Sequence, residues 1–340
     1  MNILVAVLVL GLIIFIHELG HFTMAKIFKM PVSEFAIGMG PTVYSYTTME
    51  TVYSIRAIPI GGYVSIDGME IDSEVEDGFN TKPAYARFLV LIAGVFMNFL
   101  MAFIILFVSI FINGIKEVEN IPVINKVFPE AKAYNYIKAK DKILKIDGYE
   151  IRNWEDIGNT ISKVENKENV VIELERAGEL KKLDVPLTKI SDEGKYILGV
   201  MPNLISKKIS LLEASKMSIN AGINIVEETI NGLKLLVTGK VKAKELAGPI
   251  GIINLVGQAS QQNNTMMLIW LMAVISINIG VLNLLPFPAL DGGRILFVVL
   301  ESLGIKIDKK FEERVHIIGM VILFGFIIYV TSNDITRLIK

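Results

Sequence analysis

Residues 2–21 read NILVAVLVLGLIIFIHELGH, an uncharged apolar run that ends in two histidines and a glutamate. On a helix, positions i and i+4 share one face, so His17 and His21 can offer two imidazole nitrogens to one zinc ion. Glu18 can then reach a water molecule on the metal. A soluble zinc enzyme would not place this HExxH motif in an apolar helix. The stretch therefore predicts metallopeptidase chemistry inside a membrane.

A simpler explanation is that the two histidines only pack or cap a helix. The chain has 3 histidines, however, and two of them flank a glutamate at metal-ligand spacing. Burying a carboxylate in an apolar helix costs several kcal/mol unless it is paired or used, so an intramembrane glutamate is a functional candidate. Metal binding is the favoured interpretation.

Composition supports the membrane setting. Charged residues make up 20% of the chain and apolar residues 52%, and the mean hydropathy is +0.52. Four apolar blocks, at residues 3–25, 88–115, 265–290 and 315–333, are each long enough to cross about 30 Å of hydrocarbon as a helix. The first block has no basic flank before it and no A-x-A-like site, so its removal as a signal peptide is not expected.

Basic residues orient the predicted spans. Lysines and arginines cluster between the first and second blocks and between the third and fourth, and none precedes the first. Those two loops are therefore expected in the cytoplasm, with both termini and residues 116–264 outside. The chain has no cysteine from which to infer a redox compartment. Its net charge of −1 offers no basic footprint, so no nucleic-acid partner is expected.

A zinc site of this kind needs a third protein ligand. The first and third spans run in the same direction, so the end of the third lies at about the depth of the HExxH motif. There, residues 283–293 read NLLPFPALDGG, and Asp291 is the first carboxylate after an uncharged run from residue 246. Asp-Gly-Gly can also be a plain helix-ending turn. Glu34 or Glu50 would be the third ligand in the alternative of a water-facing zincin.

HExxH in the first span, with N-x-x-P-x-P-x-L-D-G late in the third, resembles the site-2 protease family of intramembrane metalloproteases, in its bacterial RseP-type branch. The resemblance implies that His17, His21 and Asp291 hold Zn²⁺. It implies that Glu18 is the general base and that Asn283, the first residue of the second motif, is an active-site helper.

Two other segments are similar to that family. Residues 35–64 read as strands with a glycine turn and resemble its membrane-associated β-hairpin, which contacts the substrate by strand addition. Gly61, Gly62 and Tyr63 are the expected substrate contacts, and a plain surface hairpin is the alternative. Residues 94–98, GVFMN, resemble a Gly-Pro-x-x-Asn element without its proline, which implies a helper role for Asn98.

The outside segment begins with a small α+β domain. It has short β-rich runs, turn signals at its Asp-Gly and Ala-Gly pairs, and a helical stretch at residues 154–164. The run AKDKILKIDG at residues 139–148 is similar to a PDZ motif, with Lys140 in place of a glycine. The resemblance implies one PDZ-like domain.

The expected fold class is a polytopic α-helical membrane protein of about four transmembrane helices, with a membrane-associated β-hairpin and one extracytoplasmic PDZ-like α+β domain. His316, at the start of the fourth span, is expected to be an interfacial histidine. The expected divisions are a first span with HExxH (1–30), a cytoplasmic-side loop with the hairpin (31–87), a second span (88–115), the PDZ-like domain (116–190), an amphipathic helix and connecting loop (191–264), a third span with NxxPxPxLDG (265–293), and a cytoplasmic loop with the fourth span (294–340).

These features predict a zinc metalloendopeptidase that hydrolyses peptide bonds within the membrane. The resemblance implies regulated intramembrane proteolysis at the bacterial inner (cytoplasmic) membrane, among its lipids. It implies single-span substrates, such as anti-sigma factors or remnant signal peptides, trimmed first by a site-1 protease. The competing class is a non-catalytic membrane PDZ scaffold with a structural zinc site, which usually has four protein ligands. A transporter is disfavoured, because the spans show no repeat of broken helices.

Overall fold

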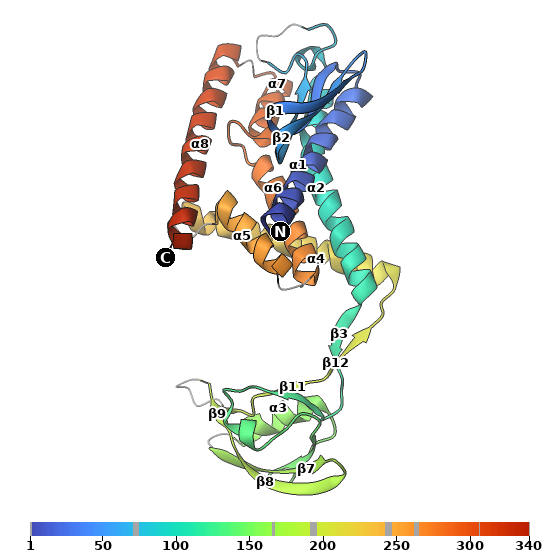
Figure 1. Ribbon diagram of the computed structural model, residues 1–340, viewed down its shortest axis with the longest axis vertical. Coiled ribbons are helices and arrows are strands. Elements are labelled where there is room, and N and C mark those ends of the chain that lie inside the picture. Colours follow the sequence, from blue (N-terminus) through green and yellow to red (C-terminus); the bar gives the residue numbers. More distant parts are fainter. Residues whose placement is uncertain are drawn as a thin grey trace. The chain divides into compact units, whose positions relative to one another are not determined.

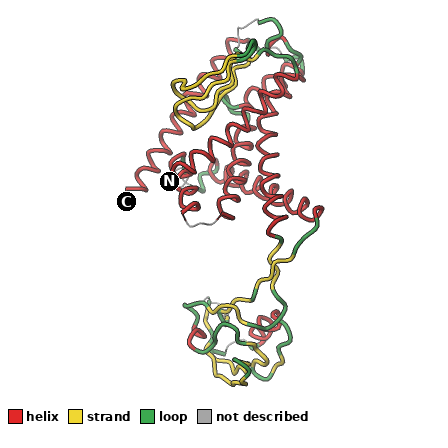
Figure 2. The backbone as a smooth tube through the Cα atoms, turned by 45° about the vertical axis from the view of Figure 1, so that its right-hand side comes forward, coloured by secondary structure: helices red, strands yellow, loops and turns green. Residues whose placement is uncertain are grey.

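The computed structural model describes residues 2–70, 75–164, 167–190, 196–241, 247–261, 265–305 and 307–339 of the chain. Two compact units make up the protein. The first combines Met1–Phe111 with Leu211–Lys340, and the second is Ile112–Ser210. Helices dominate the first unit and strands the second (Figures 1 and 2).

Among the described residues, the first unit has four helices that are long and apolar enough to cross a membrane. They are α1 (Asn2–Ile27), α2 (Ala84–Asn113), α6 (Thr265–Leu284) and α8 (Lys309–Ile339). Large apolar side chains point away from the protein, and Ile3, Val321 and Ile328 are 71%, 68% and 68% exposed. Large exposed apolar surfaces are rare on soluble proteins, whereas they are expected on helices that contact lipid. The four predicted spans are confirmed, and the protein is a multi-pass membrane protein.

Three further helices surround the spans: α4 (Leu211–Val237), α5 (Pro249–Gln261) and α7 (Asp291–Ser302). Residues 247–252, which contain Gly-Pro and a second glycine, are typical of a turn within the predicted connecting loop, yet α5 begins among them at Pro249. The reason is Asp334 on α8, whose carboxylate accepts hydrogen bonds from the N–H groups of Gly248 (3.1 Å) and Gly251 (2.7 Å). The third span ends earlier than predicted, at Leu284, and Asp291 begins a separate helix.

The hairpin of β1 (Val32–Thr47) and β2 (Val52–Ile66) packs against α1 (Figure 1). Phe35 pairs with both Val64 and Tyr53, so the first part of β1 lies between the two ends of β2. Residues 62–66 therefore form one edge of the sheet, and no other described strand pairs with them there. Phe35 also contacts Phe22 of α1, with ring centroids 5.0 Å apart, which fixes the sheet on the helix.

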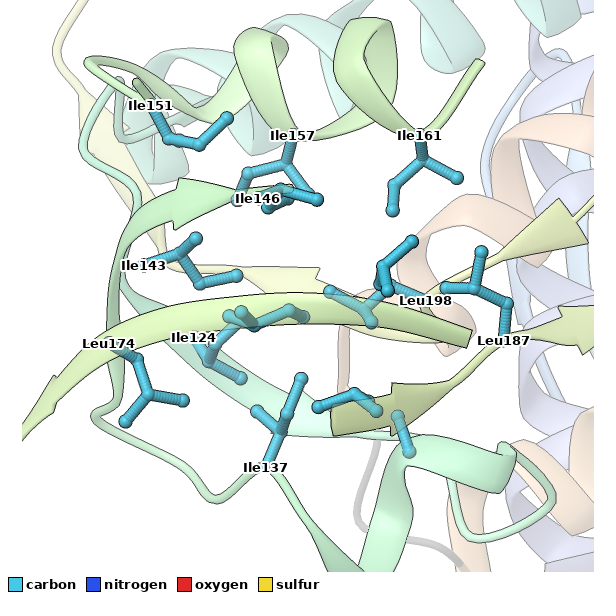
Figure 3. Packing of buried hydrophobic residues seen from close by; sticks show 14 of the residues in the cluster. Ile124, Ile137, Ile143, Ile146, Ile151, Ile157, Ile161, Leu174, Leu187 and Leu198 are labelled. Atoms are coloured by element: carbon cyan, nitrogen blue, oxygen red, sulfur yellow. The ribbon is translucent and has the colours of Figure 1, made fainter. Parts of the chain in front are cut away.

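The second unit is built on a four-stranded antiparallel sheet of order β6-β5-β7-β8, packed against α3 (Trp154–Lys163). Ile157 and Ile161 of α3 face Ile146 and its neighbours in the buried core (Figure 3). The other elements are β3 (Ile115–Val118), β4 (Ile124–Val127), η2 (Lys132–Asn135), β5 (Lys142–Ile146), β6 (Tyr149–Glu150), β7 (Asn169–Arg176), β8 (Glu179–Pro186), β9 (Thr188–Lys189), β10 (Tyr196–Ile197), β11 (Val200–Pro202) and β12 (Leu204–Lys207). This is the sheet-rich, PDZ-like α+β domain that the motif predicts.

Two details of this unit refine the sequence interpretation. Lys140 has φ 72°, a left-handed conformation that costs glycine less than any other residue, which accounts for a glycine at this place in the motif. The carboxylate of the adjacent, fully buried Asp141 accepts two hydrogen bonds from Arg176, at 2.8 and 2.7 Å. Because β11 pairs with β4 and β12 with β3, the unit extends to residue 210, and the predicted end at residue 190 was too early.

Candidate metal centre

Three donor atoms from distant parts of the chain meet beside α1. The Nε2 atoms of His17 and His21 lie 3.1 Å apart. Asp291 Oδ2 lies 3.1 Å from the first and 3.3 Å from the second. Both histidines are 6% exposed. Among the described residues, these three form the one cluster of histidine and carboxylate donors close enough to share an ion. Two imidazoles and one carboxylate suit zinc and leave a coordination position for water or substrate.

Hydrogen bonds behind the imidazoles aim Nε2 at this point. His21 Nδ1 lies 2.8 Å from the carbonyl oxygen of Val90 on α2, so Nδ1 carries the proton and donates it. His17 Nδ1 lies 3.2 Å from the Asn98 amide, whose buried Oδ1 has no hydrogen-bond partner among the described residues. Exchanging the amide oxygen and nitrogen, which have nearly the same shape, lets Oδ1 accept from His17 Nδ1–H. Both Nε2 atoms are then free to bind a metal, as a zinc site requires.

Two glycines allow the close approach of α1 and α2 at this site. A Cβ on Gly20, within the HExxH motif, would lie 2.4 Å from the carbonyl oxygen of Ala93. A Cβ on Gly94 would lie 2.4 Å from His21 Nε2 and 2.8 Å from His17 Cε1. Any side chain at position 94 would therefore occupy the place of the imidazole rings.

Asp291 reaches the histidines because the chain turns back sharply after α6. Residues 285–290 form a tight loop that leads into α7. A Cβ on Gly292 would lie 2.3 Å from the carbonyl oxygen of Leu285, and one on Gly293 would lie 2.4 Å from that of Phe287. Close backbone packing thus explains both glycines after Asp291, and the segment is more than an open surface turn.

The donor atoms border a cavity of about 460 Å³. Glu18 lines this cavity, together with Asn283 and with Tyr63 and Val64 of β2. Asn283 Nδ2 lies 3.4 Å from His17 Nε2. The cavity therefore brings together the three metal-ligand candidates, a carboxylate and one edge of the sheet.

Of the three predicted substrate contacts, Tyr63 lines the cavity, and a Cβ on Gly62 would lie 3.8 Å from Glu18 Cγ. Gly61 has φ +88°, which favours glycine, and Gly62 leaves room for β1, since its Cβ would lie 2.7 Å from the carbonyl oxygen of Ala36. The Tyr63 hydroxyl donates to Glu34, which also accepts a hydrogen bond from Arg56 at 2.8 Å. This cluster ties the cavity edge of β2 to the first part of β1.

The two carboxylates considered as alternative third ligands each form an ion pair with a basic side chain. Glu34 pairs with Arg56 at 2.8 Å, and Glu50 pairs with Lys26 at 2.9 Å. Neither carboxylate belongs to the donor cluster, so the arrangement of a water-facing zincin is contradicted.

Two residues near the site were missed or misplaced from the sequence. The expectation of an interfacial His316 is wrong, because the residue is 8% exposed and its Nδ1 accepts a hydrogen bond from the Ala289 N–H at 3.2 Å. Arg294 lines the cavity and donates to the carbonyl oxygen of Met69 at 3.3 Å. Arg294 lies one helical turn after Asp291, and this spacing could have placed it near the site from the sequence. No comparable sequence pattern pointed to His316.

Apolar spanning helices, a HExxH helix and a buried His-His-Asp cluster beside a glutamate define a membrane-embedded zinc metalloprotease. Comparison with known families agrees with this class: the family model described as "Peptidase family M50" matches residues 5–326. The chain therefore belongs to peptidase family M50, the site-2 proteases.

Individual relatives cover almost the whole chain. A protein of Fusobacterium nucleatum named as a zinc metalloprotease is 48% identical over 99% of both chains. The regulator of sigma-W protease RasP of Bacillus subtilis is 27% identical over 99% of both chains. Among solved structures, the PDZ domain of the SdrC-like protein of Listeria monocytogenes is 20% identical, covering 26% of this chain and 93% of its own, with a TM-score of 0.23.

Proposed function

We propose that this protein cleaves single-span membrane proteins within their transmembrane segments. The observation that carries the proposal is the shared cavity, in which His17, His21 and Asp291 meet Glu18 beside the edge of β2 that pairs with no other described strand. The cavity lies among helices that are apolar enough to span a membrane. A peptide bond delivered there would be hydrolysed away from bulk water.

In this mechanism, His17, His21 and Asp291 hold zinc, which when bound lowers the pKa of water and polarises the scissile carbonyl. Glu18 accepts the proton of the attacking water and passes it to the leaving nitrogen. Asn283 lines the same cavity, where its amide N–H can donate to the carbonyl oxygen of the scissile bond. Asn98 keeps His17 in the tautomer that presents Nε2.

Substrate binding uses the edge of β2 at residues 62–66. A transmembrane helix satisfies its own backbone hydrogen bonds, so the substrate must unwind before its carbonyl can be attacked. An exposed strand edge can hold the unwound segment through main-chain hydrogen bonds. Tyr63 lines the cavity and Gly62 lies beside Glu18, which supports the assignment of Gly61, Gly62 and Tyr63 as the segment that contacts the substrate.

The setting we propose is the inner membrane of a bacterium, with both termini and the PDZ-like domain outside the cytoplasm. Lysines and arginines in the two loops assigned to the cytoplasm support this orientation. A relative named as a regulator of a sigma factor supports anti-sigma factors as one substrate type, with remnant signal peptides as another. The PDZ-like domain would exclude substrates that an upstream site-1 protease has not trimmed.

A scaffold with a structural zinc ion is the competing function. Such a site normally has four protein ligands, whereas the described residues bring three to this cluster. The open position and the adjacent Glu18 support catalysis instead.

The test is cleavage of a reporter with one transmembrane segment and a short outer tail, reconstituted with the purified protein in lipid vesicles. We expect a cut within the transmembrane segment, located by mass spectrometry. The matched reporter with a folded outer domain should resist cleavage. Zinc bound to a protein that cuts neither reporter would favour the scaffold.

A further inference from the structure

The loop that carries Asp291 contains a strained residue. Ala289, two positions before Asp291, has φ +79°. Non-glycine residues rarely adopt such angles, and they persist where surrounding contacts impose them. Glycine would take the same conformation at less cost. Something in the fold therefore holds Ala289 in place.

The backbone N–H of Ala289 donates to Nδ1 of His316, on α8, at 3.2 Å. His316 is 8% exposed, and its other nitrogen, Nε2, has no hydrogen-bond partner among the described residues. The bond to Ala289 is thus the hydrogen bond that fixes this buried ring. The ring of Phe297 on α7 lies against it, with centroids 5.5 Å apart.

A second contact joins α8 to the same loop, which projects toward α8 in Figure 1. Gly319 lies one helical turn after His316, so the two share a face of α8. A Cβ on Gly319 would lie 2.3 Å from Pro288 Cβ and 2.7 Å from the Pro288 carbonyl oxygen. The loop is therefore held at two consecutive residues, Pro288 and Ala289, by two positions of one helix.

We propose that His316 is a positioning residue of the metal site: through the Ala289 N–H it fixes the loop that presents Asp291, so that α8 controls the third ligand. The proposal rests on the proposed role of Asp291 as that ligand. It gives the fourth spanning helix a function in the active site, although α8 contributes no residue to the donor cluster.

The test compares two substitutions at position 316. In His316→Asn the side-chain oxygen takes the place of Nδ1 and can still accept from Ala289, whereas His316→Leu keeps bulk without an acceptor. We expect His316→Leu to bind zinc about 10- to 100-fold more weakly in chelator competition. We also expect it to change the visible absorption of the cobalt-substituted protein. His316→Asn should retain near wild-type values.

A rescue separates positioning from general packing. Adding Ala289→Gly to His316→Leu removes the cost of the positive φ and should restore most of the zinc affinity, which a packing defect in α8 would not allow. Wild-type zinc affinity and cobalt spectrum in His316→Leu would overturn the proposal. Equal loss in the Asn and Leu variants, or no rescue by Ala289→Gly, would also overturn it.

Two controls complete the design. If His316→Leu does not fold, Gly319→Ala is compared with Gly325→Ala, which lies on the same helix with open space around it. Zinc loss in the first alone supports the proposal, and equal affinities overturn it. Asp291→Ala is measured in parallel: if that variant keeps its zinc, the ligand assignment fails, whereas zinc loss there with normal affinity in His316→Leu refutes only the role of His316.

Discussion

At the scale of single residues, Gly94 leaves the space that the two histidine rings of the metal centre occupy. A methyl group there would lie 2.4 Å from His21 Nε2, the atom assigned to zinc. We therefore expect Gly94→Ala to weaken zinc binding by about tenfold or more, as changes around a metal ligand typically do. Metal content after purification by emission spectrometry measures this.

Gly232→Ala is the matched control, because a Cβ at that helical position meets nothing within 4 Å. Equal zinc content in both variants would show that α1 and α2 can move apart to make room for the methyl group, and that zinc binding does not need their close packing at Gly94.

Several site residues could be named from sequence alone, because they carry a local pattern. His17, Glu18 and His21 follow helical spacing, and Asp291 follows a long uncharged run. The structure brings these four to one cavity, while their chemical roles remain predictions. His316 could not be found in this way, because its significance depends on one hydrogen bond to a residue 27 positions away.

At the scale of elements, the β1–β2 hairpin carries a pH-sensitive cluster outside the spanning helices. Partial burial raises the pKa of Glu34, but hydrogen bonds from Ser54, Tyr63 and Arg56 outweigh it and hold the pKa below its usual value. A lowered pKa in the folded state means that the ionised carboxylate stabilises the hairpin above the unfolded value of about 4.3. That stability is lost as the pH falls through the folded pKa.

We expect acidification below about pH 4 to speed hydrogen exchange of residues 52–66, followed by mass spectrometry and corrected for intrinsic rates. Glu34→Gln should exchange faster at neutral pH and lose this acid response. Glu50→Gln is the control, since the Glu50 side chain is 79% exposed in its pair with Lys26. Identical pH profiles of hydrogen exchange in the wild type and Glu34→Gln would show that ionisation of Glu34 does not stabilise the hairpin.

The points where helices begin and end were harder to predict than the presence of the four spanning helices. Apolar length identifies the four spanning helices directly. The break between α6 and α7 was marked by two prolines, but the start of α5 depends on Asp334, 86 positions from Gly248. Contacts between such distant residues leave no periodic signal, so local patterns missed the second of these boundaries.

At the scale of the whole molecule, the proposed topology can be tested by cysteine labelling, because the chain has no cysteine of its own. Single cysteines at Ser45, Ser162 and Ser302 occupy exposed positions in the hairpin, α3 and the end of α7. With an impermeant thiol reagent, we expect Ser162→Cys to react in intact cells and the other two only after lysis. Labelling of Ser45→Cys and Ser162→Cys from the same side would contradict the orientation.

The most direct test of intramembrane zinc catalysis measures zinc content and reporter cleavage together in Glu18→Gln and Asp291→Ala. We expect Glu18→Gln to keep its zinc while cleavage falls by about 10²- to 10⁴-fold, because only the proton acceptor is lost. Asp291→Ala should lose both zinc and cleavage. Wild-type cleavage in Glu18→Gln, or full zinc and cleavage in Asp291→Ala, would show that this cavity is not the catalytic centre.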